Sequence, residues 1–213
     1  MGTIRNGGNG AFSGKAGSFI GSSWKNVDYI KGIPKLSNKP ATPKQLEQRQ
    51  RFAIALAFLT PIRDLVNTGY KGPAGNKSTG MNMAMQHTLT NAIVGTYPDL
   101  SIDPELVIIS KGSLQKPSDL TMLVTAETSL TLNWFVNLSK SCSFADDKLF
   151  VLIYHPVRDL FLVFEEIATR GLGIANIQLP NQFAEESFFV YAFFQQRDNS
   201  RCSNSVCAGL LVS

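Results

Sequence analysis

Alternation of apolar and polar residues is clearest between Ser129 and Asn137, where Leu130, Leu132 and Trp134 alternate with polar neighbours. A period of two indicates a strand with one buried face. Segments of similar length and spacing lie on both sides, separated by turn-forming residues, and such a series predicts an antiparallel β-sandwich over residues 101–213. The expected strands are Leu106–Ser110, Leu120–Glu127, Ser129–Asn137, Lys148–Tyr154, Leu160–Ile167, Ser187–Gln196 and Val206–Val212.

Helical patterns are confined to residues 44–100. Thr42 is suited to an N-cap, with Pro43 at the first helical position and Gln45 three residues after the cap. The helix that follows is expected to kink or end at Pro61 and to leave Ile62–Asn67 as a second short helix. Its apolar side is expected to consist of Leu46, Phe52, Ile54, Leu56, Phe58 and Leu59.

A further helix is expected from Met81 to about Val94, with its methionines packing rather than forming a ligand surface. Thr96–Pro104 is rich in turn-forming residues and is expected to lead into the sandwich.

The first 43 residues differ in character from the rest. Residues 1–16 are dominated by glycine, and ordering such a backbone is costly in entropy, so we expect a flexible arm unless it docks on another surface. Gly17–Ile33 predicts a hairpin that turns at Lys25 and Asn26 and pairs Trp24 with Val27. In that register Ser22 faces Tyr29 and Ile20 faces Lys31. Residues 34–43 contain three prolines and predict an extended strap.

These elements predict an α+β chain of three parts. Residues 1–43 form the arm, hairpin and strap, residues 44–100 a small helical region, and residues 101–213 the sandwich. At 213 residues and 44% hydrophobic content, the chain needs no metal or disulfide to build a core.

Charge is distributed unevenly along the chain. Residues 1–51 carry nine Lys/Arg against two Asp/Glu, whereas the remainder carries eleven against fourteen. A basic front and an acidic back attract nucleic acid or each other in neighbouring copies, and we favour the second because the basic residues are spaced singly. We expect no specific nucleic-acid partner. No secretory signal or membrane span is evident, so we expect a cytoplasmic protein or one released by a non-classical route within an assembly.

The sequence contains few residues or motifs that are typical of catalytic sites. Gly14-Lys15 fails the phosphate-loop pattern because Asn9 and Ala16 occupy two of its required positions, and Gly171–Asn176 lacks the last glycine of the dinucleotide fingerprint and is interpreted as a turn. Only two histidines exist to act as a base, His87 on a predicted helix and His155 at a strand end, and His155 is expected to face solvent or to be hydrogen-bonded at a turn. The acidic pairs are expected to point apart or into solvent. We therefore predict no enzyme, no cofactor and no metal site. The residues weighed were His87, His155, Cys142, Asp146-Asp147, Glu165-Glu166 and Glu185-Glu186.

The remaining cysteines, Cys202 and Cys207, lie across a predicted hairpin end. They are expected to be thiols, with a disulfide as the alternative under oxidising conditions.

Two resemblances add to these patterns. The succession of Trp134, Tyr154 and Tyr191 resembles the core aromatics of fibronectin type III domains, a class of sandwich related in architecture to immunoglobulin domains. Nearly the whole chain resembles an uncharacterised bacterial family of about this length, found mainly in Bacteroidota and without established activity. The stretches that carry this resemblance are MGTIRNG, FSGKAGSFIGSSWKNVDYIK, TPKQLEQRQRFAIALAFLTPIRD, NAIVGTYPDLSID and the S-x-S-x-C-x-G of residues 203–209.

We favour a structural protein that assembles with copies of itself into a filament, tube or particle through its arm and hairpin. The hairpin is too apolar on one face to remain in water, so that face covers either the protein's own helices or a neighbouring subunit. The expected contact residues are Phe12, Phe19, Ile20, Trp24, Val27, Tyr29 and Ile30, with Lys15, Lys25 and Lys31 meeting acidic groups.

Two other hypotheses remain. The first alternative is a monomeric sandwich that binds glycan or another surface ligand. The last long strand carries more phenylalanines than one buried face needs, so one alternating half of them is core and the other half covers the helices or a partner. These residues are Phe188, Phe189, Phe193 and Phe194. An enzyme is the third hypothesis, and it would require a pocket on which His155 or an acidic pair converges.

Overall fold

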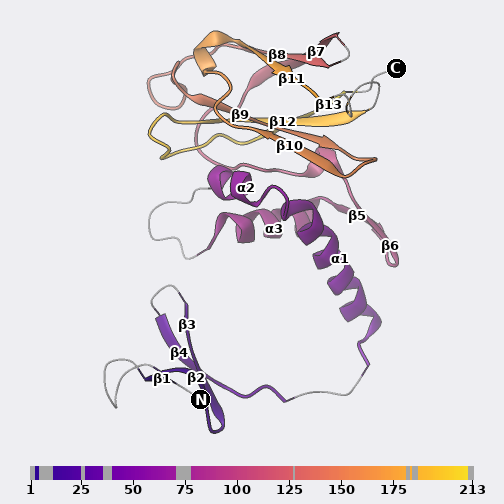
Figure 1. Ribbon diagram of the computed structural model, residues 1–213, viewed down its shortest axis with the longest axis vertical. Helices are drawn as coiled ribbons and strands as arrows, with labels where there is room; N and C mark the ends of the chain where they lie inside the picture. The colour runs from indigo at the N-terminus through magenta and orange to yellow at the C-terminus, as the bar shows by residue number, and fades with distance from the viewer. Residues whose placement is uncertain are drawn as a thin grey trace. The chain divides into compact units, whose positions relative to one another are not determined.

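A computed structural model describes residues 3–4, 12–24, 27–35, 40–70, 78–126, 128–180, 183 and 187–210. The chain divides into two compact units, Met1–Thr42 and Pro43–Ser213. The second unit contains both the helices and the sandwich (Figure 1).

The second unit is built on a β-sandwich of seven strands. One sheet has the order β10 (Leu160–Phe164), β9 (Lys148–His155), β12 (Phe188–Gln195) and β13 (Val206–Leu210). The other has the order β11 (Ile174–Gln178), β8 (Ser129–Phe135) and β7 (Ser118–Ala126). Neighbouring strands are antiparallel throughout. The predicted α+β class with a C-terminal antiparallel β-sandwich is confirmed.

One strand prediction is wrong, and one turn prediction is wrong in part. Residues 104–106 form the short 3₁₀ helix η1 (Pro104–Leu106), and the following Val107–Ser110 is irregular, with a bend at Ile109, and joins no sheet. Its backbone is satisfied elsewhere, since the Ile109 N–H donates to the Ser205 hydroxyl. The seventh strand is β11, which begins at Ile174 inside the stretch interpreted as a turn. The turn itself is confined to η2 (Arg170–Leu172) and Gly173.

The four-stranded sheet is buried on both faces. In β9, Leu149, Val151 and Ile153 face the three-stranded sheet, whereas Phe150 and Leu152 belong to the core formed with the helices. The same division holds in β12, where Phe188, Val190, Ala192 and Phe194 point one way, and Tyr191 and Phe193 the other. The alternate residues of the phenylalanine run, Phe189 and Phe193, therefore face the protein's own helices.

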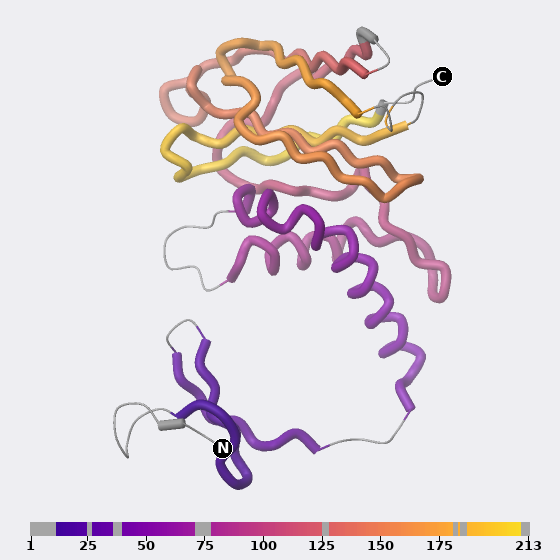
Figure 2. Tube along the Cα trace, viewed as in Figure 1, coloured from indigo at the N-terminus to yellow at the C-terminus, as the bar shows by residue number. Residues whose placement is uncertain are grey.

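The helical layer begins with α1 (Pro43–Leu59), which starts at the predicted proline and ends before Pro61. It continues with α2 (Arg63–Gly69) and α3 (Gly80–Asn91). The predicted helix to Val94 ends at Asn91, because Ile93 opens a hairpin of β5 (Ile93–Thr96) and β6 (Asp99–Ile102) where a bridge rich in turns was expected. Figure 2 shows α2 and α3 beneath the four-stranded sheet.

The predicted apolar side of α1 is only partly buried. Phe58 and Leu59 are in the core, and the Phe58 ring packs edge-on against Tyr154 and Phe161. Leu46, Phe52 and Leu56 are instead exposed. The helix also packs against α3 and β6, and within the second unit neither contact buries these three residues.

The cysteines are thiols, as expected. Cys202 is buried and its Sγ donates to the Thr68 carbonyl oxygen, while Cys207 lies near the Pro104 carbonyl oxygen. Burial raises the pKa of the Cys207 thiol to about 12, which keeps it protonated and unreactive at neutral pH.

One ion pair is enclosed at the end of the sandwich. The Arg170 Nε donates to the Asp147 carboxylate at 2.9 Å, and the two side chains are 3% and 0% exposed. The guanidinium also donates to the Gln115 carbonyl oxygen and lies 3.9 Å from the centre of the Phe194 ring. Trp134 donates its indole N–H to the Arg170 carbonyl oxygen, so the pair is tied to the inter-sheet core.

We expect Arg170→Met to destabilise the second unit by about 3–5 kcal/mol, because it leaves the Asp147 carboxylate buried without its cation. Guanidinium denaturation followed by Trp134 fluorescence in a Trp24→Phe background measures the loss. Arg197→Met is the matched control: its pair with Asp146 is 78% and 51% exposed and should contribute less than about 1 kcal/mol. Equal losses in the two variants would contradict the buried-pair argument.

Candidate assembly surface

The first unit is a four-stranded antiparallel meander. Its strands, β1 (Thr3–Ile4), β2 (Phe12–Ala16), β3 (Phe19–Trp24) and β4 (Val27–Gly32), pair in sequence order. The hairpin register is as predicted, with Trp24 opposite Val27, Ser22 opposite Tyr29 and Ile20 opposite Lys31. The predicted turn residues, Lys25 and Asn26, lie outside the described residues.

Part of the predicted flexible arm belongs to this sheet. β2 pairs with β3 through Gly14–Gly21, Lys15–Ile20 and Ala16–Phe19. The pairing depends on Gly21, because a Cβ built there would lie 2.0 Å from the Phe12 carbonyl oxygen. Residues 12–16 are therefore the exception allowed for in the expectation of a flexible arm, because they dock on β3. The missing side chain of Gly21 allows the close approach of the two strands.

The cross-strand pairs divide the expected contact residues between two faces. Directly opposite residues share a face in an antiparallel pair. One face carries Ile20, Trp24, Val27 and Tyr29 with Lys15 and Lys31, and we call it the tryptophan face. The opposite face, the phenylalanine face, carries Phe19 and Ile30, with Phe12 crossing over Gly21.

Both faces expose large apolar side chains. Trp24 is 48% exposed, Tyr29 44%, Phe19 55% and Ile30 63%. Among the described residues of this unit, no apolar side chain larger than glycine is buried, and all of β4 is exposed. The described part of this sheet thus buries no apolar core of its own, although sheets in water usually need an apolar face packed on another layer.

The charges of this unit follow the same division. Lys15, Ile20 and Lys31 form one row across three strands, so both described strand lysines lie on the tryptophan face. Asp28 lies opposite Ser23 on the phenylalanine face. Residues 1–42 contain six Lys/Arg and this single acidic residue, against fourteen Lys/Arg and fifteen Asp/Glu in residues 43–213. The tryptophan face is therefore both apolar and basic.

Ile33 extends this surface and was missed. Its N–H donates to the Ser18 carbonyl oxygen at 3.2 Å, which continues the ladder beyond β4, and its side chain is 40% exposed. The alternation of residues 27, 29 and 31 continues to 33, so the period of two was the signal that could have found it.

Several of the residues weighed for catalysis have structural partners. Asp147 is paired with Arg170, and the Glu166 carboxylate accepts from Lys148 at 2.7 Å. His155 is fully buried, its Nδ1 accepts from the Arg158 N–H, and its ring packs edge-on against Phe183. Glu185 and Glu186 lie outside the described residues. No group of three or more His, Cys, Asp or Glu in the described part of the chain is placed to hold a metal.

Within that same part, no helix has the length and apolar character needed to span a bilayer.

Comparison with known proteins identifies the family. The profile of a family of unknown function (DUF6266) matches residues 11–209, and the chain belongs to that family. No curated protein matches the chain. Among solved structures, it is similar to the fn3 domain of human collagen alpha-1(XX) chain, with 18% identity, TM-score 0.34 and coverage of 47% of this chain and 87% of that one. It is also similar to the fn3 domain of human contactin 1, with 10% identity, TM-score 0.32 and coverage of 56% and 93%.

We expect Gly21→Val to disrupt the pairing of β2 with β3, because its side chain would meet the Phe12 backbone rather than a movable group. Overpacking of this kind costs about 1–3 kcal/mol. Hydrogen exchange of residues 12–24 in the full-length protein measures the loss of protection. Gly32→Val provides the control, since no atom lies within 4 Å of a Cβ at position 32. Unchanged protection in Gly21→Val would show that the strands do not cross at this glycine.

Proposed function

We propose that this protein is a non-enzymatic structural protein that assembles with copies of itself, as a filament, tube or particle, through its N-terminal sheet. The observation that carries the proposal is the tryptophan face, on which Trp24, Val27 and Tyr29 are each about half exposed in a unit whose described residues bury no apolar core. Exposed apolar patches of this kind mark interaction surfaces in soluble proteins.

Charge supports another copy of the chain as the occupant of this face. Lys15 and Lys31 flank Ile20, and residues 43–213 carry a slight excess of acidic residues. A basic apolar face is complementary to an acidic surface, and complementary charges steer association and fix its register.

The strap after the sheet, residues 34–43, would let the tryptophan face of one copy reach the second unit of another copy. It contains Pro34 and Pro40 and ends at Pro43. About ten residues in a proline-rich extended conformation span roughly 30 Å. Docking of the face on the second unit of the same chain is the competing arrangement, and a measurement of mass separates the two.

A second candidate function is the binding of a glycan or another surface ligand by the sandwich. The outer face of the three-stranded sheet carries Phe135 and Ile174, which are 62% and 46% exposed, and farther along the same face Thr131 and Asn176. The Thr131 hydroxyl donates to the Asn176 side-chain oxygen. An exposed aromatic ring and a polar pair on the same face of a sheet support contact with an extended sugar chain.

Deletion of residues 1–33 tests the first proposal. We expect the full-length protein to form high-order assemblies and the truncated protein to be monomeric, because the deletion removes the face that copies share. Light scattering and electron microscopy measure the assembly, and Trp134 fluorescence reports whether the sandwich is still folded. A full-length protein that is monomeric at all concentrations would refute self-assembly and favour the ligand-binding alternative.

Charge reversal on the tryptophan face provides a milder test. We expect Lys31→Glu to weaken self-association by about 1 kcal/mol, or roughly fivefold, and to reduce its dependence on salt. Lys35→Glu makes the same change of charge at an exposed position beyond the last strand and should have little effect. Sedimentation equilibrium at two salt concentrations measures both variants. Equal weakening by both would mean that net charge, rather than this face, controls association.

A further inference from the structure

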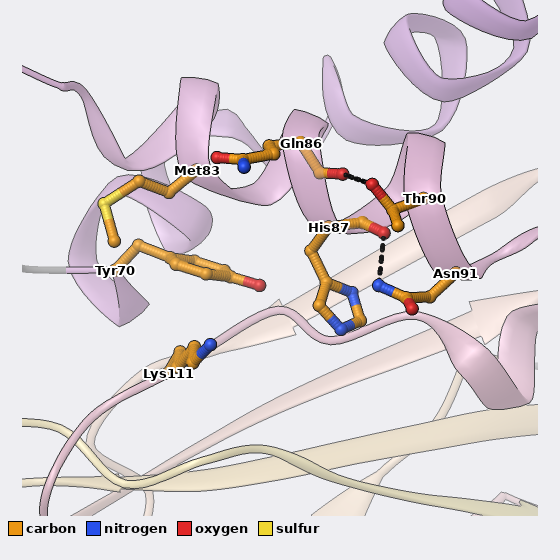
Figure 3. Close-up of a pocket in the computed structure, with 7 residues that line it drawn as sticks. All are labelled: Tyr70, Met83, Gln86, His87, Thr90, Asn91 and Lys111. Atoms are coloured by element: carbon orange, nitrogen blue, oxygen red, sulfur yellow. Dashed lines mark hydrogen bonds between the residues drawn. The ribbon is translucent and has the colours of Figure 1, made fainter.

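A pocket of about 260 Å³ lies in the second unit, between α3 and the segments that follow α2 and Ser110. Its lining residues come from three parts of the chain (Figure 3): Tyr70, Met83, Gln86, His87, Thr90, Asn91 and Lys111. The five from α3 have helical spacing and therefore share one face of that helix. The volume equals that of about eight or nine water molecules, which suits a small ligand.

Several lining groups are held in place. The Tyr70 hydroxyl donates to the Ile108 carbonyl oxygen at 2.8 Å, and the Lys111 backbone N–H donates to the Gly69 carbonyl oxygen at 3.1 Å. Along α3, the Thr90 hydroxyl donates to the Gln86 carbonyl oxygen and the Asn91 amide to the His87 carbonyl oxygen. These bonds fix the walls without involving the Lys111 ammonium or the His87 ring.

Two basic groups therefore meet in this pocket without a counter-charge. No carboxylate among the described residues forms an ion pair with Lys111, and no carboxylate lines the pocket. The His87 Nδ1 is enclosed and has no hydrogen-bond partner among those residues.

The charges that line the pocket indicate which sign of charge a ligand would carry. Burial, and secondarily the charge of Lys111, lower the pKa of His87, so the pocket disfavours a second positive charge. Burial also raises the pKa of Tyr70, which stays neutral at physiological pH. His87, Lys111 and Tyr70 are the titratable groups of the lining. An anion beside Lys111 would remove the repulsion and favour protonated His87.

We propose that this pocket binds a small oxyanion, a carboxylate or a phosphate group, between the Lys111 ammonium and the His87 imidazole. The Gln86 amide is a further donor at the rim, and Tyr70 and Met83 supply an apolar wall for the carbon skeleton of the ligand (Figure 3). The site lies within the second unit and does not depend on the N-terminal sheet or on self-assembly.

Histidine NMR tests the proposal in the full-length protein, because the chain contains only His87 and His155. Inorganic phosphate and succinate are titrated separately at constant ionic strength, with chloride as the balancing anion, and His87→Gln identifies the His87 signals. We expect a saturable shift of the His87 ring signals and a rise in the His87 pKa, while the buried His155 stays unchanged. The sign follows from linkage: an anion that favours protonated His87 binds more tightly as the pH falls.

Two matched lysine variants distinguish binding in this pocket from non-specific attraction of anions to a positively charged protein. Lys111→Met should weaken binding at least tenfold, about 1.4 kcal/mol. Lys116→Met removes the same charge from an exposed position outside the pocket and should leave binding unchanged. Saturation by phosphate alone assigns a phosphate ligand, and saturation by succinate alone assigns a carboxylate. A linear shift with both anions, or a Lys111→Met protein that titrates like the wild type, overturns the proposal.

Discussion

Burial of the four-stranded sheet on both faces is the constraint on which the second unit depends. Side chains of β9 alternate between the inter-sheet core and the helical layer, and each fully buried large apolar side chain contributes about 1.5–3 kcal/mol. Removing the helices would expose Phe150, Tyr191 and Phe193 together, so the helices are part of the domain rather than an addition to it. The face of the four-stranded sheet that the helices cover is consequently occupied by the chain's own residues.

Local sequence signals predicted those elements whose structure is decided locally. The Trp24–Val27 pairing follows from a short turn flanked by alternating residues, and the end of α1 follows from Pro61. The alternation around Trp134 likewise identified β8 and the face that it buries. Prediction failed where distant segments decide the outcome. Leu46 and Phe52 look like core residues in the helical pattern but are exposed, because within the second unit the contacts of α1 with α3 and β6 do not bury them.

Candidate sites were less predictable than strands, for the same physical reason. The tryptophan face lies within one hairpin, so a period of two was enough to find most of it. The β2 crossing over Gly21 was not predicted because glycine shows where a close approach is allowed, not which strand makes it. The pocket around His87 joins residues from three segments, and nothing in the spacing of Tyr70 or Lys111 connects them to α3. Asp146 and Asp147 looked alike in sequence, yet one is exposed and the other has no exposed surface.

The two faces of the N-terminal sheet differ in chemistry, and this difference bears on the form of the proposed assembly. The tryptophan face combines apolar groups with two lysines, whereas the phenylalanine face combines Phe19 and Ile30 with Asp28. Surfaces that differ in this way do not suit the same partner patch, so contacts made by both would be heterologous rather than a self-complementary pair. Heterologous contacts form rings when the rotation closes and filaments when it does not. A sheet that is apolar on both faces therefore favours an extended or ring-like assembly over a closed dimer, because a dimer formed through one face would leave the other in water.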